Sequence, residues 1–167
     1  SGDTHAAAEQ TTGSTFIPAK ALAAAADEVE RQNPPTFRID EVQAAQRYYN
    51  ESPFVNRIAD VRKSLGRPKA NVTRVAGEAS LAFVTIMWDI IWYQYVVDLR
   101  RDIPLSTERV CLYREGMDLD ELAFYQREKN AVVNDDGKLD ASEREVRLLS
   151  DPSALIPEMV SEETVLA

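Results

Sequence analysis

The chain has 167 residues, 44% of them hydrophobic, which is enough to bury the core of one domain. Its formal charge of −9 disfavours nucleic acids and anionic membrane surfaces as partners of the whole chain. A single cysteine, Cys111, excludes an intrachain disulfide and with it the small secreted scaffolds that disulfides hold together.

The first fifteen residues are small and polar, and they contain no basic region followed by an apolar one. We expect a disordered tail or a tag remnant at 1–15. The single cysteine and the lack of a signal-peptide pattern favour a cytoplasmic location. Prior removal of a signal peptide would leave secretion open.

Three helices are predicted in the next fifty residues. Pro18 suits the first turn of a helix over 18–32, which a pair of prolines ends. Asp40 is placed to cap a second helix over 40–50. Apolar residues at spacings of four, three and four predict a third helix over 54–65.

The segment 78–101 contains no glycine or proline and is apolar nearly all round, which is typical of a helix that other helices surround. Its β-branched and aromatic residues would also suit a strand, but the run is much longer than an ordinary strand. We therefore predict a central helix, with Trp88 and Trp92 in a core or dimer interface. Asp89 near its middle disfavours a membrane span, and we expect this carboxylate to be buried beside a hydrogen-bonding or ionic partner.

Capping residues mark the remaining predicted helices. Ser106 precedes a short helix that ends at a glycine, and Asp118 precedes one that runs to Val133. Asp140 is placed to cap another, and Pro152 begins the last.

Together these segments predict an all-α fold, an irregular bundle of about seven helices around the central helix at 78–101. We expect a single domain over 16–160, followed by an acidic tail at 161–167.

Residues 132–143 read VVNDDGKLDASE. With Gly137 as the sixth residue of a loop, oxygen ligands fall at the third, fifth, seventh, ninth and twelfth positions. The stretch thus resembles the calcium-binding loop of the EF-hand family. The metal ligands that this resemblance implies are Asn134, Asp136, the carbonyl of Lys138, Asp140 and Glu143.

The match to the EF-hand loop is incomplete. Val132 supplies no side-chain oxygen at the first position, and the chain contains no second loop of this pattern. The same residues also suit a simple turn at Gly137 followed by a capping box of Asp140 and Glu143. The sequence favours the turn and leaves a calcium site as the alternative.

The segment 57–74 is basic within an acidic protein. Its basic residues are Arg57, Arg62, Lys63, Arg67, Lys69 and Arg74. We predict that they form an interaction surface for phosphates or for an acidic partner. The last third of the chain, from Glu115, holds fourteen acidic and five basic residues, so it is the expected partner, within the chain or on a second copy.

The tripeptide Gly66-Arg67-Pro68 resembles the centre of the AT-hook, a DNA-binding motif whose arginine lies in the minor groove. Leu65 stands where that motif has a basic residue. The tripeptide is also an ordinary way to end a helix. Weak nucleic-acid binding through 57–74 is therefore a minor alternative.

Several kinds of catalytic chemistry lack a necessary residue. The only histidine is His5 in the expected tail, which excludes a Ser-His-Asp triad, a Cys-His pair and a histidine-ligated zinc or haem site from the folded part. The six glycines are scattered and match no phosphate-binding loop. An enzyme that uses carboxylates such as Asp89 is kept in reserve.

These observations predict a non-catalytic, acidic, helical module for protein–protein interaction or regulation that needs no cofactor. Its expected partner is a protein or a second copy of the chain. The alternative is a calcium-binding protein that uses the 132–143 loop.

Overall fold

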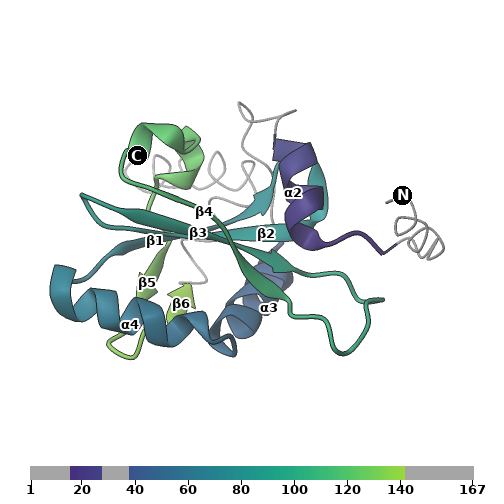
Figure 1. The fold of residues 1–167 in the computed structure, drawn as a ribbon, viewed down its shortest axis with the longest axis horizontal. Helices are drawn as coiled ribbons and strands as arrows, with labels where there is room; N and C mark the ends of the chain where they lie inside the picture. The colour runs from purple at the N-terminus through teal and green to yellow at the C-terminus, as the bar shows by residue number, and fades with distance from the viewer. Residues whose placement is uncertain (1–15, 28–37, 142–167) are drawn as a thin grey trace, which may run out of the picture.

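The computed structural model describes residues 16–27 and 38–141, and its centre is a six-stranded antiparallel sheet (Figure 1). The strands lie in the order β4-β3-β2-β1-β5-β6. They are β1 (Lys69–Val75), β2 (Glu78–Met87), β3 (Trp92–Asp98), β4 (Val110–Gly116), β5 (Ala131–Val133) and β6 (Leu139–Ala141). The helices are α2 (Ala19–Asp27), α3 (Ile39–Asn50) and α4 (Phe54–Leu65), with short 3-10 turns η2 (Leu119–Glu121) and η3 (Phe124–Gln126).

The predicted all-α bundle is wrong, because the supposed central helix at 78–101 is the hairpin of β2 and β3. The two strands pair antiparallel from Met87 opposite Trp92, and the backbone N–H of Trp88 donates to the carbonyl of Ile91 (2.8 Å) to close the turn. Both faces of these strands are covered, so their side chains are apolar on both sides. The sequence therefore lacks the alternation of apolar and polar residues that marks a half-buried strand. The tight turn also forms without the glycine or proline that marks many turns.

Two further predicted helices are wrong. The one expected after Ser106 is β4, which pairs with β3. The one expected after Asp118 consists of η2, η3 and then β5. The side chain of Asp118 does accept a hydrogen bond from the backbone N–H of Asp120 (2.9 Å), so the capping interaction forms at a single turn that does not extend into a helix.

The helices predicted at 40–50 and 54–65 are confirmed as α3 and α4, and α2 lies within the helix predicted at 18–32. The expected tail at 1–15, the helix that was to begin with Pro152 and the acidic tail at 161–167 lie outside the described residues. No helix within the described ranges is long and apolar enough to cross a membrane.

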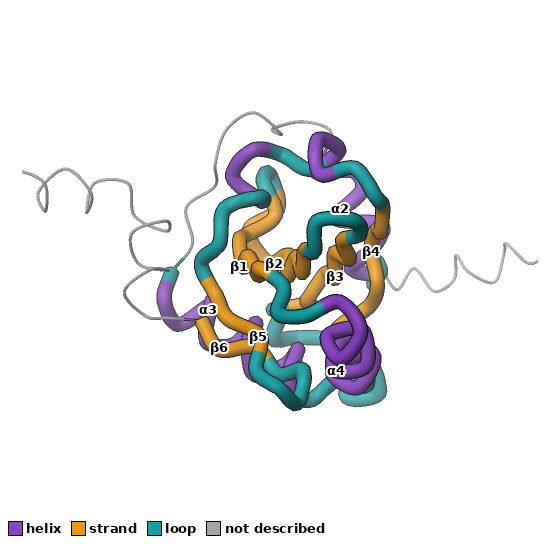
Figure 2. Tube along the Cα trace, turned by 90° about the vertical axis from the view of Figure 1, so that its left-hand side faces the viewer, coloured by secondary structure: helices purple, strands orange, loops and turns teal. Residues whose placement is uncertain are grey.

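Helices α3 and α4 cover one face of the sheet, and Figure 2 shows them on the side of the strands opposite to α2. The core on the α3 and α4 side is continuous and almost entirely apolar. Its fully buried residues include Val42, Tyr49, Ile58, Val84 and Tyr95. Burial of this apolar face is the main contribution to the stability of the fold.

The short hairpin of β5 and β6 extends the sheet beyond β1. Only Ala70 and Ala131 are register partners between β1 and β5. The side-chain amide of Asn130 adds two bonds to the backbone of Val72, accepting from its N–H (2.8 Å) and donating to its carbonyl (2.9 Å). Asn130 thus continues the ladder where the strand itself does not, and this buried residue satisfies two polar groups of β1.

Candidate functional site

The stretch that resembles an EF-hand loop is the turn between β5 and β6. The backbone N–H of Asn134 donates to the carbonyl of Lys138 (2.8 Å), and that of Gly137 donates to the carbonyl of Asn134 (2.9 Å). Gly137 has a φ of 84°, a conformation that favours glycine. The residues on both sides of the turn, 131–133 and 139–141, are strands rather than the helices that flank an EF-hand loop.

Four of the five metal ligands implied by the resemblance lie on this hairpin, and Glu143 lies outside the described residues. Within the turn, the carboxylate of Asp136 accepts from the N–H of Lys138 (3.1 Å). Asp140 is an exposed residue of β6. Across the described part of the chain, no group of three or more His, Cys, Asp or Glu side chains is arranged to hold a metal ion. Calcium binding by 132–143 stays a prediction.

Two basic side chains of 57–74 pair with acidic residues of the chain itself. Arg62 lies 2.9 Å from the carboxylate of Asp135, and Arg74 forms an ion pair with Glu41 of α3. Asp135 belongs to the acidic last third, so one contact of the expected kind forms within the chain. Arg62 and Arg74 are only about a fifth exposed, and they serve the fold more than a free surface.

Two other predicted interaction residues are exposed residues of α4. Lys63 is 3.7 Å from Asp60 one helical turn away, and both side chains are mostly exposed. The guanidinium of Arg57 lies over the ring of Tyr93, 5.3 Å from its centroid. The exposed ion pair between Lys63 and Asp60 contributes about 0.5 kcal/mol or less to stability.

Three predicted interaction residues, Arg67, Lys69 and Trp88, do meet in one place. They line a hollow of about 310 Å³ at the end of the sheet where β2 turns into β3, and we call it the turn hollow. Its lining residues are Leu65, Arg67, Lys69, Met87, Trp88, Asp89 and Ile90. Trp92, the remaining predicted residue, is buried elsewhere, and its indole N–H donates to the carbonyl of Asp118 (3.0 Å).

The shape of the turn hollow is set by a bond between its two sides. The indole N–H of Trp88, from the β2–β3 turn, donates to the carbonyl of Gly66 at the end of α4 (2.7 Å). Gly66 has a φ of 90°, which lets the chain leave α4 and enter β1. Trp88 is itself 6% exposed, so it forms the floor of the hollow rather than its rim.

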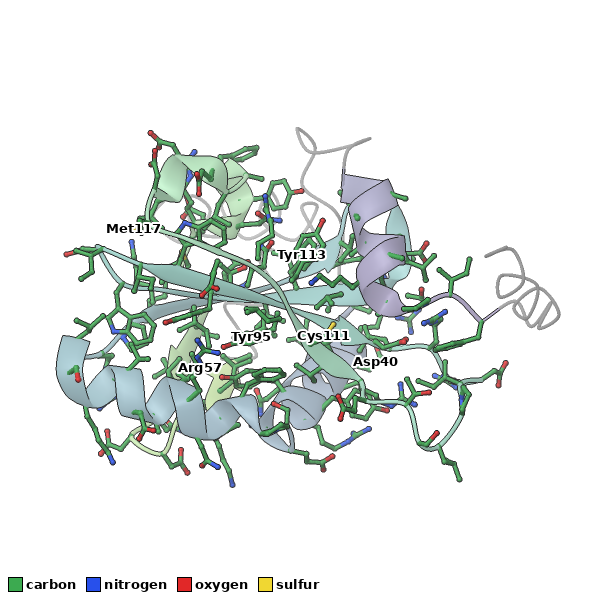
Figure 3. All side chains as sticks on the ribbon, in the orientation of Figure 1. Asp40, Arg57, Tyr95, Cys111, Tyr113 and Met117 are labelled. Atoms are coloured by element: carbon green, nitrogen blue, oxygen red, sulfur yellow. The ribbon has the colours of Figure 1, made fainter. Side chains whose placement is uncertain are left out.

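The rim of the turn hollow is apolar and unusually exposed. Ile90 is 60% exposed and Leu65 is 40% exposed. Met117, 77% exposed, follows Gly116, whose register partner is Trp92, so it lies at the same end of the sheet (Figure 3). Sequence reasoning missed these three residues, since it placed Ile90 inside a buried helix. Clustered exposed apolar side chains mark interaction surfaces.

The charge at the turn hollow is opposite to that of the chain. Arg67 and Lys69 are exposed, and neither has a carboxylate within 4 Å among the residues described. Asp89 is the one acidic side chain of the lining. Its expected burial is wrong, because Asp89 is an exposed residue of the β2–β3 turn.

Cys111 lies half-buried on β4 beside the cluster that α2 covers. Burial raises the pKa of its thiol, which lowers the thiolate fraction and hence its reactivity near neutral pH.

Comparisons of the chain with models of protein families, with curated proteins and with solved structures found no match.

Proposed function

We propose that this protein is a non-catalytic protein-interaction module that binds an acidic partner segment with apolar side chains at the turn hollow. One observation carries the proposal. Exposed Leu65 and Ile90 border a hollow whose two cations, Arg67 and Lys69, have no carboxylate within 4 Å among the described residues, on a chain with a net charge of −9.

The apolar and charged parts of this surface have different roles. Burial of the Ile90 side chain against a partner removes apolar area from water, which stabilises a complex by roughly 25 cal/mol for each Å². Arg67 and Lys69 select an acidic partner and raise the rate of association more than they raise affinity. Because the Trp88 to Gly66 bond holds the hollow in one shape, little ordering is needed when the partner binds.

The partner is a separate protein or a second copy of this chain, whose last third is acidic. The two cases predict different masses of the complex. In both, the segment that enters the turn hollow carries carboxylates for Arg67 and Lys69 and an apolar side chain for Ile90.

A photo-activated crosslinking residue in place of Ile90 tests the proposal in cells that make the protein. Irradiation should give a discrete adduct whose partner peptide, identified by mass spectrometry, is acidic. Leu105, a fully exposed apolar residue in the loop at the opposite end of the sheet, gives the matched control position. Absence of an adduct at 90, or equal adducts at 90 and 105, would contradict the proposal.

Charge reversal tests whether the two cations select the partner or whether the partner only lies near position 90. Arg67→Glu/Lys69→Glu should reduce the adduct at position 90 by about tenfold, since it places like charges opposite the partner. Lys129→Glu/Lys138→Glu changes the total charge equally at exposed positions away from the turn hollow, and it should leave the adduct unchanged. An equal reduction by both variants would mean that net charge, rather than this surface, controls the contact.

A further inference from the structure

A second hollow lies between α3 and the loop that joins β3 to β4, toward the end of the molecule away from Met117 (Figure 3). It encloses about 490 Å³, within the usual size of a small-molecule site. Its charged and aromatic lining residues are Asp40, Glu41, Arg47, Tyr48, Arg101 and Arg109. We call it the arginine hollow.

Two of its arginines are held against Tyr48. The guanidinium carbon of Arg47 lies 4.9 Å from the centroid of the Tyr48 ring, and that of Arg109 lies 4.4 Å from it. Arg109 also donates to the carbonyls of Asp98 and Arg100, both at 2.8 Å. These contacts fix Arg109 before any ligand arrives, which reduces the entropy lost on binding.

The backbone that carries Arg101 is also fixed. The buried carboxylate of Asp98 accepts from the backbone N–H of Arg100 (3.0 Å) and from its guanidinium (2.7 Å). Arg100 then reaches the carbonyl of Ile17, beside α2 (2.8 Å). The next residue along, Arg101, lines the hollow from the loop that joins β3 to β4.

The two carboxylates of the arginine hollow pair with cations that do not line it. Glu41 forms an ion pair with Arg74 of β1 and accepts from the backbone N–H of Arg38 (3.1 Å). Asp40 accepts from the guanidinium of Arg38 (3.3 Å). Among the described residues, neither acid lies within 4 Å of a guanidinium nitrogen of Arg47, Arg101 or Arg109.

The three arginines of this hollow have no ionic partner among the residues that the structure describes. Within the described ranges, Arg47, Arg101 and Arg109 have no carboxylate within 4 Å. Planar guanidinium groups bind carboxylate and phosphate oxygens in pairs. We propose that the arginine hollow binds a small oxyanion with two or more negative charges, such as a phosphate ester or a polycarboxylate.

An adjoining hollow of about 290 Å³ limits where the anion lies. It shares Tyr48 and Arg109 with the arginine hollow, but its acidic lining residues are Glu51 and Glu108. These carboxylates repel an oxyanion from the adjoining hollow. The anion is thereby favoured in the arginine hollow, beside Arg47 and Arg101. This site is separate from the turn hollow and does not depend on the function proposed for it.

Isothermal titration calorimetry with inorganic pyrophosphate and with citrate tests this site, with sodium chloride at equal ionic strength as the reference. We expect saturable one-to-one binding of at least one anion. Binding of pyrophosphate alone would identify phosphate esters as the ligand class, and binding of citrate alone would identify polycarboxylates. No saturable binding of either anion would overturn the proposal.

Matched substitutions locate the site. Arg47→Gln and Arg101→Gln alter exposed residues and should each weaken binding by roughly tenfold, the usual effect of one lost charge-assisted contact. Arg101→Lys keeps the charge without the planar fork and should fall between the wild type and Arg101→Gln. Lys129→Gln, an exposed position outside both hollows, should leave the affinity unchanged. Binding that Arg47→Gln and Arg101→Gln leave intact, or that Lys129→Gln weakens equally, would overturn the assignment.

Discussion

The face of the sheet beneath α3 and α4 carries one continuous apolar core, whereas the opposite face carries two small apolar clusters with buried polar side chains between them. The first face depends on the close packing of apolar side chains, which is sensitive to changes of volume. The second depends on hydrogen bonds among Thr85, Gln94 and Arg114, which are sensitive to the loss of a single partner. The two faces should therefore respond to different kinds of substitution.

Gly137→Ala should have the largest effect on the free energy of unfolding. It tests how closely the β5–β6 turn packs against α4. A Cβ atom at this position would lie 2.1 Å from the carbonyl oxygen of Val55 and 2.9 Å from the backbone nitrogen of Ala59. The positive φ adds strain of roughly 1–2 kcal/mol. We expect a loss of about 3 kcal/mol or more in the free energy of unfolding, measured by urea denaturation.

Gly66→Ala is the matched control for this effect. Gly66 has a φ of 90°, but no atom lies within 4 Å of an added Cβ. With a φ of 90° and a ψ of −169°, Gly66 has a conformation nearly restricted to glycine, so the loss should be limited to a backbone strain of roughly 1–3 kcal/mol. If Gly137→Ala and Gly66→Ala cost the same, the turn does not pack closely against α4.

Gln94→Leu should have a smaller effect on the polar face. Gln94 is fully buried, donates to the hydroxyl of Thr85 (3.0 Å) and accepts from two nitrogens of Arg114 (3.2 and 3.1 Å). The substitution keeps a similar volume but leaves these partners unsatisfied, so we expect a loss of about 2 kcal/mol. Ile86→Leu, a volume-conserving change in the apolar core, should cost about 1 kcal/mol or less by the same urea assay.

A double variant sharpens this prediction. Thr85→Val added to Gln94→Leu removes the hydroxyl that Gln94→Leu leaves without its partner, so the double variant should lose less stability than the sum of the two single variants. Additive losses would mean that the bond between the two side chains does not stabilise the fold.

The elements that were predicted correctly are those whose signals are local. A stripe of apolar residues and a stop at Gly66 are enough to specify α4, because a helix satisfies its own backbone hydrogen bonds. The hairpin at 78–101 has no such local signature. Its two strands are buried on both faces, and only their pairing distinguishes them from a buried helix. Asp89, the one acidic residue within the apolar part of that run, marks the turn.

The candidate sites also depend on contacts between residues that are far apart in the sequence. The sequence indicated Arg67, Lys69 and Trp88 as interaction residues, but their meeting in one hollow depends on the β2–β3 hairpin. The arginine hollow was missed entirely. Arg47 comes from α3 and Arg101 from the loop after β3, and no spacing in the sequence relates them before the sheet is formed.

Tyr49→Phe should have a small effect on stability, and its sign is opposite to that of Gln94→Leu. Tyr49 lies in the apolar core with its ring 5.7 Å from that of Tyr95, and in the part of the chain that the structure describes neither buried hydroxyl has a hydrogen-bond partner. Removal of the Tyr49 hydroxyl should therefore stabilise the fold by about 1 kcal/mol. Tyr49→Leu, which also removes the ring contacts, should instead destabilise it.

The pH dependence of the stability gained by Tyr49→Phe tests whether the buried hydroxyl is its cause. Burial, together with the nearby Tyr95, raises the pKa of Tyr49 in the folded protein above its ordinary value of about 10. Below that value Tyr49 is protonated in both states, so the gain from Tyr49→Phe should be constant. Above it the unfolded chain loses the proton while the folded chain keeps it, and the wild type loses stability as the pH rises.

Urea denaturation at pH 8 and at pH 11 should therefore show a wider gap between Tyr49→Phe and the wild type at the higher pH. The gap should approach an increase of about 1.4 kcal/mol for each pH unit beyond the unfolded pKa. An unchanged gap would mean that the Tyr49 hydroxyl ionises as readily in the folded protein as in the unfolded chain. In that case the hydroxyl would be exposed to water, and the α3 and α4 face would not be the closed apolar layer that distinguishes it from the opposite face.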